Sequence, residues 1–152
     1  MKPWSIRGAE TEDLPQVLAL LESAGLMTAG VPGHLGGFLV AAQEGRIIGT
    51  AGLELYDEVA LLRSVAVAQQ FRRRGLGSRL VAEALRLAGR REVRDVTLLT
   101  TSAAPFFRRL GFRELDRAAL DPRLAASEEL GDECCATAVA MTLRLPAGGT
   151  KE

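Results

Sequence analysis

The sequence lacks a net charge, a long apolar run and an N-terminal hydrophobic stretch. Its 19 lysine and arginine residues are balanced by 19 aspartate and glutamate residues. No overall field would therefore attract nucleic acid or an anionic membrane. No apolar run approaches the roughly 18 residues of a membrane span, and the N-terminus MKPWSIRGAE lacks the apolar region of a signal peptide. We expect a cytoplasmic protein without nucleic-acid or membrane partners.

Cysteine is scarce as well, because the chain holds only Cys134 and Cys135. A disulfide between neighbouring residues forces a strained ring, so both are expected to be reduced thiols. Vicinal thiolates suit a soft metal or metalloid. In an extended chain, however, the two side chains point to opposite faces, and free cysteine usually packs as a small hydrophobe. We favour packing and expect no metal site.

A chain of 152 residues, 47% of them hydrophobic, can bury one sizeable core. We expect a single domain over residues 1–146 and a disordered tail over 147–152. Residues 30–37 (GVPGHLGG) are too rich in glycine for a regular element and are predicted to form a loop. Strands are predicted over 5–7, 38–42 and 46–55, then after Asp57 as far as Val67, and over 96–100, 112–115 and 136–145. Helices are predicted from a cap at Thr11 or Asp13 to near Gly25, and over 79–90 and 105–110.

Residues 70–78 (QFRRRGLGS) place three arginines beside two glycines, between a predicted strand and a predicted helix. The first turn of a helix has unpaired N–H groups and the positive end of the dipole, so it suits an anion. Gly75 and Gly77 let a bulky anion approach these amides, and the arginines add charge. The spacing is neither that of a Walker loop nor that of the dinucleotide fingerprint. A phosphate or pyrophosphate is implied; the alternative is a solvated basic turn before a helix.

The pattern Arg72-x-x-Gly75-x-Gly77, following the apolar residues 61–67, resembles the acetyl-CoA-binding motif of the GNAT family of N-acetyltransferases. Residues 106–112 (FFRRLGF) resemble the second signature of that family. The resemblance implies an α/β (α+β) fold with a mixed, mostly antiparallel, V-shaped sheet of about six or seven strands and about four helices. It also implies an acyltransferase with acetyl-CoA as cosubstrate, and a homodimer.

In this family the pantetheine arm pairs with a strand as though it were another strand, and backbone amides hold the pyrophosphate. The resemblance implies this pairing for Val65 and Val67. The residues expected to bind acetyl-CoA are Val65, Ala66, Val67, Arg72, Arg73, Arg74, Gly75, Leu76, Gly77, Ser78, Thr100 and Phe107.

A narrower resemblance is to the ArsN-type acetyltransferases of bacterial arsenic-resistance operons, especially their short second subgroup. It is carried by residues 52–54 (GLE), 60–65 (ALLRSV), 98–103 (LLTTSA), 116–118 (DRA) and 135–141 (CATAVAM). Characterised members of that group acetylate the amino group of arsinothricin and its phosphorus analogue. The resemblance implies an amino-acid-like acceptor, with an arsenical as one candidate.

Transfer to an amine needs a group that removes a proton, donors for the oxyanion and an acid for the departing thiolate. The N–H near Val65 is the expected oxyanion donor. We favour Glu54, a carboxylate in an otherwise apolar strand, as base; equally, it is an outward-facing strand residue or a partner for Arg63. Arg63, next to Ser64 on the strand before the thioester, suits a substrate carboxylate. The sole histidine, His34, either meets the substrate as a base or is solvated.

One position departs from the family pattern. Many GNAT enzymes have a tyrosine that protonates the thiolate where this chain has Phe107, and the asparagine often seen before this helix is replaced by Thr100. Ser102, Thr101 or water are candidate substitutes for the acid, although a hydroxyl there more simply caps the following helix.

Three functions follow. The first is direct acetyl transfer from acetyl-CoA to a small amino-acid-like amine in detoxification. The second is transfer to another amine, such as a metabolite or a peptide terminus. The third is a catalytically weak acyl-CoA sensor, for which the absent tyrosine argues. An acidic trough would favour polyamines, whereas a cleft lined by Arg63, Arg108 or Arg109 would favour a carboxylated acceptor.

Overall fold

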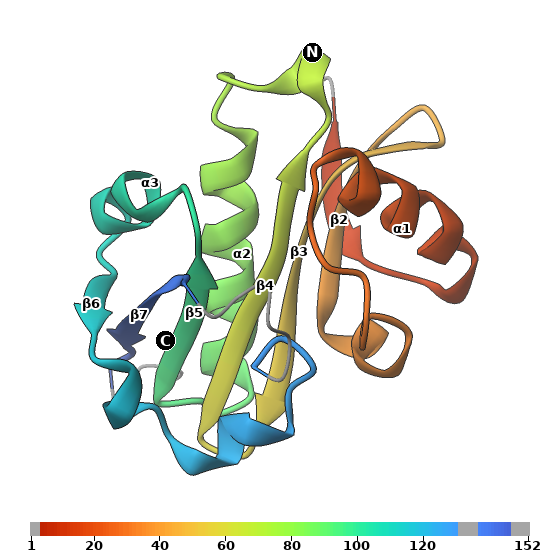
Figure 1. The fold of residues 1–152 in the computed structure, drawn as a ribbon. Helices are drawn as coiled ribbons and strands as arrows, with labels where there is room; N and C mark the ends of the chain where they lie inside the picture. Colours follow the sequence, from red (N-terminus) through yellow and green to blue (C-terminus); the bar gives the residue numbers. More distant parts are fainter. Residues whose placement is uncertain (1–3, 131–136, 147–152) are drawn as a thin grey trace.

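The computed structural model describes residues 4–130 and 137–146, which form one mixed sheet with helices on both faces (Figure 1). The strand order is β1-β2-β3-β4-β5-β7-β6. The strands are β1 (Ser5–Gly8), β2 (Phe38–Gln43), β3 (Arg46–Tyr56), β4 (Val59–Val67), β5 (Asp95–Thr100), β6 (Arg113–Leu115) and β7 (Val139–Arg144). The α-helices are α1 (Leu14–Ser23), α2 (Leu76–Arg90) and α3 (Ala104–Arg109). Short 3-10 helices are η1 (Thr11–Asp13), η2 (Pro32–Gly37), η3 (Gln69–Phe71), η4 (Arg117–Ala119) and η5 (Pro122–Ala126).

Apolar side chains alternate between the two faces of the central strands. On β3, Ile48 packs in the cluster that contains Leu80 of α2, whereas its neighbour Ile47 packs in the cluster that contains Val17 and Leu21 of α1. Successive residues of a strand point to opposite faces. The helices α2 and α1 therefore cover opposite faces of the sheet (Figure 1).

The sheet opens between β4 and β5, the parallel pair among the described strands. These strands pair only from Val59 opposite Asp95 to Leu61 opposite Thr97. Beyond Leu61, β4 continues along β3, while β5 continues along β7. The β5-facing edge of β4 is consequently unpaired up to Val67, which is the V-shaped opening that the family resemblance implied.

A β-bulge interrupts β4 at the same place. Gly52 pairs with Arg63 and Thr50 pairs with Ala66, so Ser64 and Val65 lie opposite the single residue Ala51. Ser64 has a φ of +59°, in the left-handed region. The extra residue shifts the alternation of side chains between the two faces of β4. Before the bulge, the odd-numbered Leu61 lies in a cluster away from α2. After the bulge, the even-numbered Ala66 does so, and the odd-numbered Val65 packs against the α2 cluster. The bulge therefore turns the backbone where the sheet opens.

The predicted elements are found, with corrections at their ends. The helix predicted over 79–90 begins at Leu76, because Gly75 adopts φ +82° as its N-cap and Gly77 and Ser78 already lie in the first turn. The strand predicted over 136–145 is shorter: β7 starts at Val139, which pairs with the last residue of β5. Residues 30–37 are not wholly irregular, because Pro32 starts η2.

Two predictions lie outside the described residues: the packing of Cys134 and Cys135, and the disorder of the tail over 147–152. Within 4–130 and 137–146, no helix combines the length and apolar character needed to cross a membrane.

Candidate active site

A cavity of about 470 Å³ lies at the unpaired edge of β4. Its walls come from the end of β4, the arginine loop, the first turn of α2, and α3. The lining residues are Val65, Ala66, Val67, Phe71, Arg72, Arg73, Gly75, Gly77, Ser78, Ala103, Phe106, Phe107 and Arg109. The cavity is thus placed where a strand edge, a helix N-terminus and several cations meet.

The two glycines of the loop keep the helix N-terminus open in different ways. Gly75, at the N-cap of α2, has φ +82°, a conformation that disfavours a side chain. A Cβ on Gly77 would lie 3.6 Å from the ring of Phe106 and 3.8 Å from Val67, which both line the cavity. The helix N–H groups at this turn therefore face the cavity without side chains between them and an anion.

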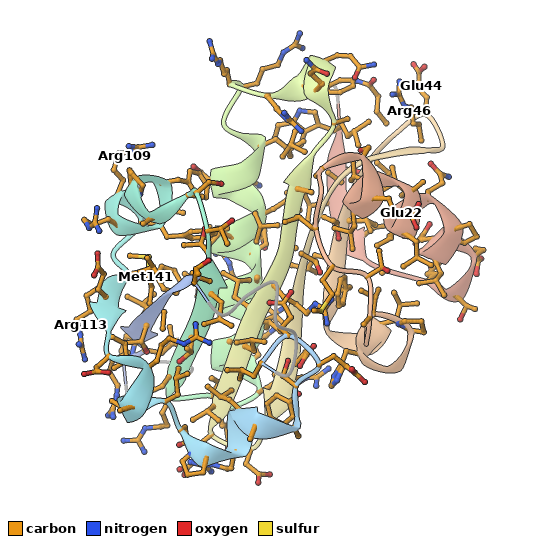
Figure 2. The ribbon with its side chains drawn as sticks, in the orientation of Figure 1. Glu22, Glu44, Arg46, Arg109, Arg113 and Met141 are labelled. Carbon is orange, nitrogen blue, oxygen red and sulfur yellow. The ribbon has the colours of Figure 1, made fainter. Side chains whose placement is uncertain are left out.

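The arginines of the loop have separate roles. Arg72 donates its Nε–H to the carbonyl of Val67, 2.9 Å away, and so ties the loop to the end of β4. The guanidinium of Arg74 stacks over the ring of Phe71, 5.6 Å from its centroid. From the other side, Arg109 lines the cavity and extends outward from α3 (Figure 2). The cavity rim is consequently cationic and suits a polyphosphate.

Most residues expected to bind acetyl-CoA line this cavity, but three do not. Leu76 is 1% exposed, and its side chain packs in the core near Gly49. The hydroxyl of Thr100 accepts a hydrogen bond from the N–H of Ala103 at 2.9 Å. Thr100 therefore stabilises the turn before α3. Arg74 reaches the site only through Phe71. The sequence interpretation missed Phe71, Ala103 and Phe106, although Phe71 and Phe106 flank the motifs that it used.

Glu54, Arg63 and His34 gather in a polar cluster on the sheet face opposite α2. Glu54 on β3 accepts a hydrogen bond from Arg63 Nη1 on β4 at 2.6 Å, and both side chains are fully buried. The Tyr56 hydroxyl donates to the other oxygen of Glu54 at 2.5 Å. His34 Nε2, from η2, lies 3.8 Å from that oxygen, and its ring meets Tyr56 edge to face. Residues from η2, β3 and β4 thereby meet at one carboxylate.

Arg63 links this cluster to three further groups. Its Nε–H donates to Ser64 Oγ at 3.0 Å, and its Nη2 donates to the carbonyl of Met27 at 3.1 Å. Glu129 Oε2, from the segment after η5, lies 3.6 Å from the same Nε. Arg63 thus holds together β3, the loop after α1 and the segment after η5.

The electrostatics of Glu54 are set by two opposing effects. Burial, the larger single effect, raises the pKa of a carboxyl, but the hydrogen bonds from Tyr56, Arg63 and Ser127 together hold the pKa of Glu54 below its usual value. Burial and the bond to Glu54 raise the pKa of Tyr56 well above its usual range. Glu54 is therefore ionised and Tyr56 protonated at neutral pH.

Two other candidates lie apart. Ser102 and Thr101 are exposed in the turn before α3 and do not line the cavity. Phe107 does line it, and its buried ring packs edge to face against Phe106 and Phe112. Among residues 4–130 and 137–146, no three His, Cys, Asp or Glu side chains are grouped to hold a metal ion.

A family model described as "Acetyltransferase (GNAT) domain" matches residues 34–114, slightly more than half of the chain. An uncharacterized N-acetyltransferase of Chlorobaculum tepidum is 34% identical over 85 residues, which are 55% of this chain and 54% of that protein. The chain thus spans about half the length of this curated relative.

Similar structures have been solved. N-acetylglutamate synthase of Neisseria gonorrhoeae, complexed with coenzyme A and N-acetyl-glutamate, superposes with a TM-score of 0.82 at 22% identity, over 96% of this chain and 36% of that one. The Mycobacterium tuberculosis protein Rv2747, in complex with CoA and NLQ, gives 0.79 at 21% identity, over 93% and 99% of the chains. These similarities confirm the predicted fold class.

Proposed function

Because this chain belongs to the GNAT acetyltransferase family, we propose that it is an acetyl-CoA-dependent N-acetyltransferase that moves the acetyl group directly to a small amino-acid-like amine. The observation that carries this proposal is the cavity at the open edge of β4, which ends at the first turn of α2. Coenzyme A is present in both similar structures described above. The residues at the cavity fit the parts of this cofactor, with apolar walls for the pantetheine arm and cations for the phosphates.

In the proposed complex the pyrophosphate lies against the amides at the start of α2, next to Arg72 and Arg73. The pantetheine arm lies along the unpaired edge of β4 from Val67 toward Val65. The thioester then reaches the bulge, where the N–H of Val65 is our oxyanion donor. No enzyme nucleophile is needed, because the amine attacks the thioester carbon directly and the CoA thiolate leaves.

The acceptor amine must lose a proton, and we assign the base to His34 rather than to Glu54. Both oxygens of Glu54 accept hydrogen bonds, and its pKa is held below its usual value, which makes it a weak base. The His34 side chain is 30% exposed and lies beside that carboxylate, which would stabilise the imidazolium formed. Glu54 then acts as a positioning residue for His34.

The CoA thiolate must gain a proton as it leaves. Because Phe107 stands where many family members have a tyrosine, we assign this proton transfer to water.

The substrate proposal rests on the ArsN-type resemblance, which favours arsinothricin or its phosphorus analogue and a role in arsenic detoxification. We further propose a cytoplasmic homodimer.

Arg109 at the cavity rim is consistent with an anionic ligand there, and Arg63, although charged, is enclosed by protein. The acceptor is therefore expected to enter from the side of η2 and His34.

The test is release of free thiol from acetyl-CoA with a panel of amino-acid-like amines that includes arsinothricin and its phosphorus analogue, with the acetylated product identified by mass spectrometry. Release with either of these two amines supports detoxification, and release only with other amines refutes the arsenical substrate. Saturable acetyl-CoA binding without release from any amine would contradict the enzyme and favour the sensor. His34→Gln should lower kcat.

A further inference from the structure

Two phenylalanines at the cavity are left partly exposed. Phe38, Phe107 and Phe112 are buried, whereas Phe71 and Phe106 are half-buried. Both half-buried rings line the cavity. An aromatic ring at the wall of a cavity offers a large apolar surface and a flat face to a ligand. Each ring is therefore a candidate contact for an apolar or flat part of the bound donor.

Phe106 lies along the part of the cavity proposed for the pantetheine arm. A Cβ on Gly77 would lie 3.6 Å from the Phe106 ring and 3.8 Å from Val67. The ring, the end of β4 and the first turn of α2 are consequently neighbours. Phe106 also packs edge to face against Phe107, with 4.9 Å between the ring centroids. We assign Phe106 to the wall that encloses the pantetheine arm.

Phe71 lies beyond the end of β4, next to the position proposed for the pyrophosphate. It is the last residue of η3, and Arg72 and Arg73 follow it directly in the chain. Figure 1 shows the connection between β4 and α2 at the end of the sheet, beyond the tip of β4. In coenzyme A the adenosine follows the pyrophosphate on the side away from the pantetheine arm. The Phe71 ring therefore lies in the direction in which the adenosine would continue.

Arg74 holds this ring from outside the cavity. Its guanidinium lies over the Phe71 ring, 5.6 Å from the centroid. Arg72 and Arg73 line the cavity together with Phe71, whereas Arg74 is not among the lining residues. A cation over an aromatic face is attracted by the electron density of the ring and so restricts its rotation. Such a ring is preorganised for stacking, because little side-chain freedom is left to lose on binding.

We propose that Phe71, backed by Arg74, stacks against the adenine ring of the acetyl donor. Every base has a flat face that can stack on an aromatic side chain, and an arginine adds a cation–π contribution. The site then holds the nucleotide half of the donor as well as its pantetheine arm. It selects a CoA thioester over an acetyl group carried on phosphopantetheine alone. This inference rests on the proposed function, because it takes coenzyme A as the donor.

Paired donors test the inference: acetyl-CoA and acetyl-phosphopantetheine, which lacks the adenosine, are titrated calorimetrically into wild type and variants. Phe71→Leu keeps an apolar side chain against the core but removes the ring. It should raise the Kd for acetyl-CoA about tenfold and leave the Kd for acetyl-phosphopantetheine unchanged. Phe71→Trp keeps an aromatic face and should bind acetyl-CoA as wild type does. Circular dichroism checks that each variant is folded.

Two arginine variants complete the set. Arg74 is exposed, so Arg74→Gln tests the stacked pair without altering the core. This variant should raise the Kd for acetyl-CoA about threefold and leave that for acetyl-phosphopantetheine unchanged. Arg79 is the matched control, because it is exposed on α2, lies 3.4 Å from Glu83 and is not among the residues that line the cavity. Arg79→Gln should bind both donors as wild type does.

An equal loss of affinity for both donors in Phe71→Leu would overturn the inference, by assigning Phe71 to the pantetheine arm or to the shape of the loop. Unchanged affinity for both donors would also overturn it, and in either case the transferase stands. Adenosine 3′,5′-bisphosphate, the nucleotide half of the donor, gives a readout independent of transfer. If no amine is acetylated but this nucleotide binds wild type more tightly than Phe71→Leu, the proposed function fails alone; without that difference, both fail.

Discussion

Glu54 and Arg63 form a fully buried ion pair across β3 and β4, with 2.6 Å between Oε2 and Nη1. Glu54 pairs with Leu61 and Arg63 with Gly52, so the two side chains are diagonal neighbours in the ladder. Further hydrogen bonds from Tyr56 to Glu54, and from Arg63 to Met27 and Ser64, satisfy the remaining polar atoms of the pair. Such a pair specifies one arrangement of the surrounding segments rather than adding much net stability.

Removing both partners of this pair should cost less stability than the two single removals added together. Glu54→Gln or Arg63→Gln alone should lower the free energy of unfolding by about 3–5 kcal/mol, because an unpaired charge stays buried. The double variant should lose less than the sum of the two. Urea unfolding of the four proteins measures this coupling. The exposed pair Arg108 and Glu114, 2.8 Å apart, is the control, and Glu114→Gln should cost no more than about 1 kcal/mol.

Glu54 should also contribute to acid sensitivity. Its pKa in the folded protein lies below its usual value of 4.5, so its stabilising effect is present above that pH and is lost as the pH falls through the folded pKa. The groups facing it are His34, Tyr56, Arg63 and Ser127. The stability difference between wild type and Glu54→Gln should therefore shrink below about pH 4.5, measured by urea unfolding across the acid range. A difference that is constant with pH would contradict the pKa shift.

Because of the bulge, glycine should be tolerated at position 64 better than valine. With φ +59°, this position favours glycine over any β-branched residue. Ser64→Val should destabilise the protein by about 2 kcal/mol, because it adds backbone strain and removes the acceptor for Arg63 Nε. In Ser64→Gly, relief of strain offsets the lost hydrogen bond, and stability should be near that of wild type. Thermal unfolding distinguishes the two, and equal losses would argue against the bulge.

Local signals in the sequence predicted the parts of the site that are close in sequence. The loop over 70–78 was recognised because Gly75 and the arginines sit between a strand and a helix, and the structure places a cavity there. The start of α2 was missed because the φ of Gly75, and not a polar cap, determines it. The helical turn η2 was missed because the glycine content of residues 30–37 was given more weight than the start signal of Pro32.

The polar cluster shows what sequence patterns do not contain. An ion pair between Glu54 and Arg63 was one of two readings, because alternation alone does not say which face of a strand is enclosed. The approach of Glu129 to Arg63 depends on how the segment after η5 folds back over β4, and no periodicity encodes that contact. Likewise, His34 was placed only in a loop, whereas η2 brings it beside Glu54.

Two glycines of α2 offer a matched test of the cavity. Alanine at Gly77 or at Gly89 should each stabilise the helix by about 0.5–1 kcal/mol, since neither position has a positive φ. A Cβ at Gly89 meets nothing within 4 Å, whereas a Cβ at Gly77 lies between Phe106 and Val67. Gly77→Ala should therefore weaken CoA binding by about tenfold, equal to 1.4 kcal/mol, and Gly89→Ala should not. Equal affinities in the two variants would place CoA elsewhere.

The first experiment is a calorimetric titration of the wild-type protein with acetyl-CoA, the donor proposed to lie in the cavity between the open edge of β4 and the first turn of α2. We expect saturable binding of one acetyl-CoA per chain, weakened at high salt because the cationic loop meets the phosphates. If the folded protein shows no saturable binding, the cavity does not hold the acetyl donor.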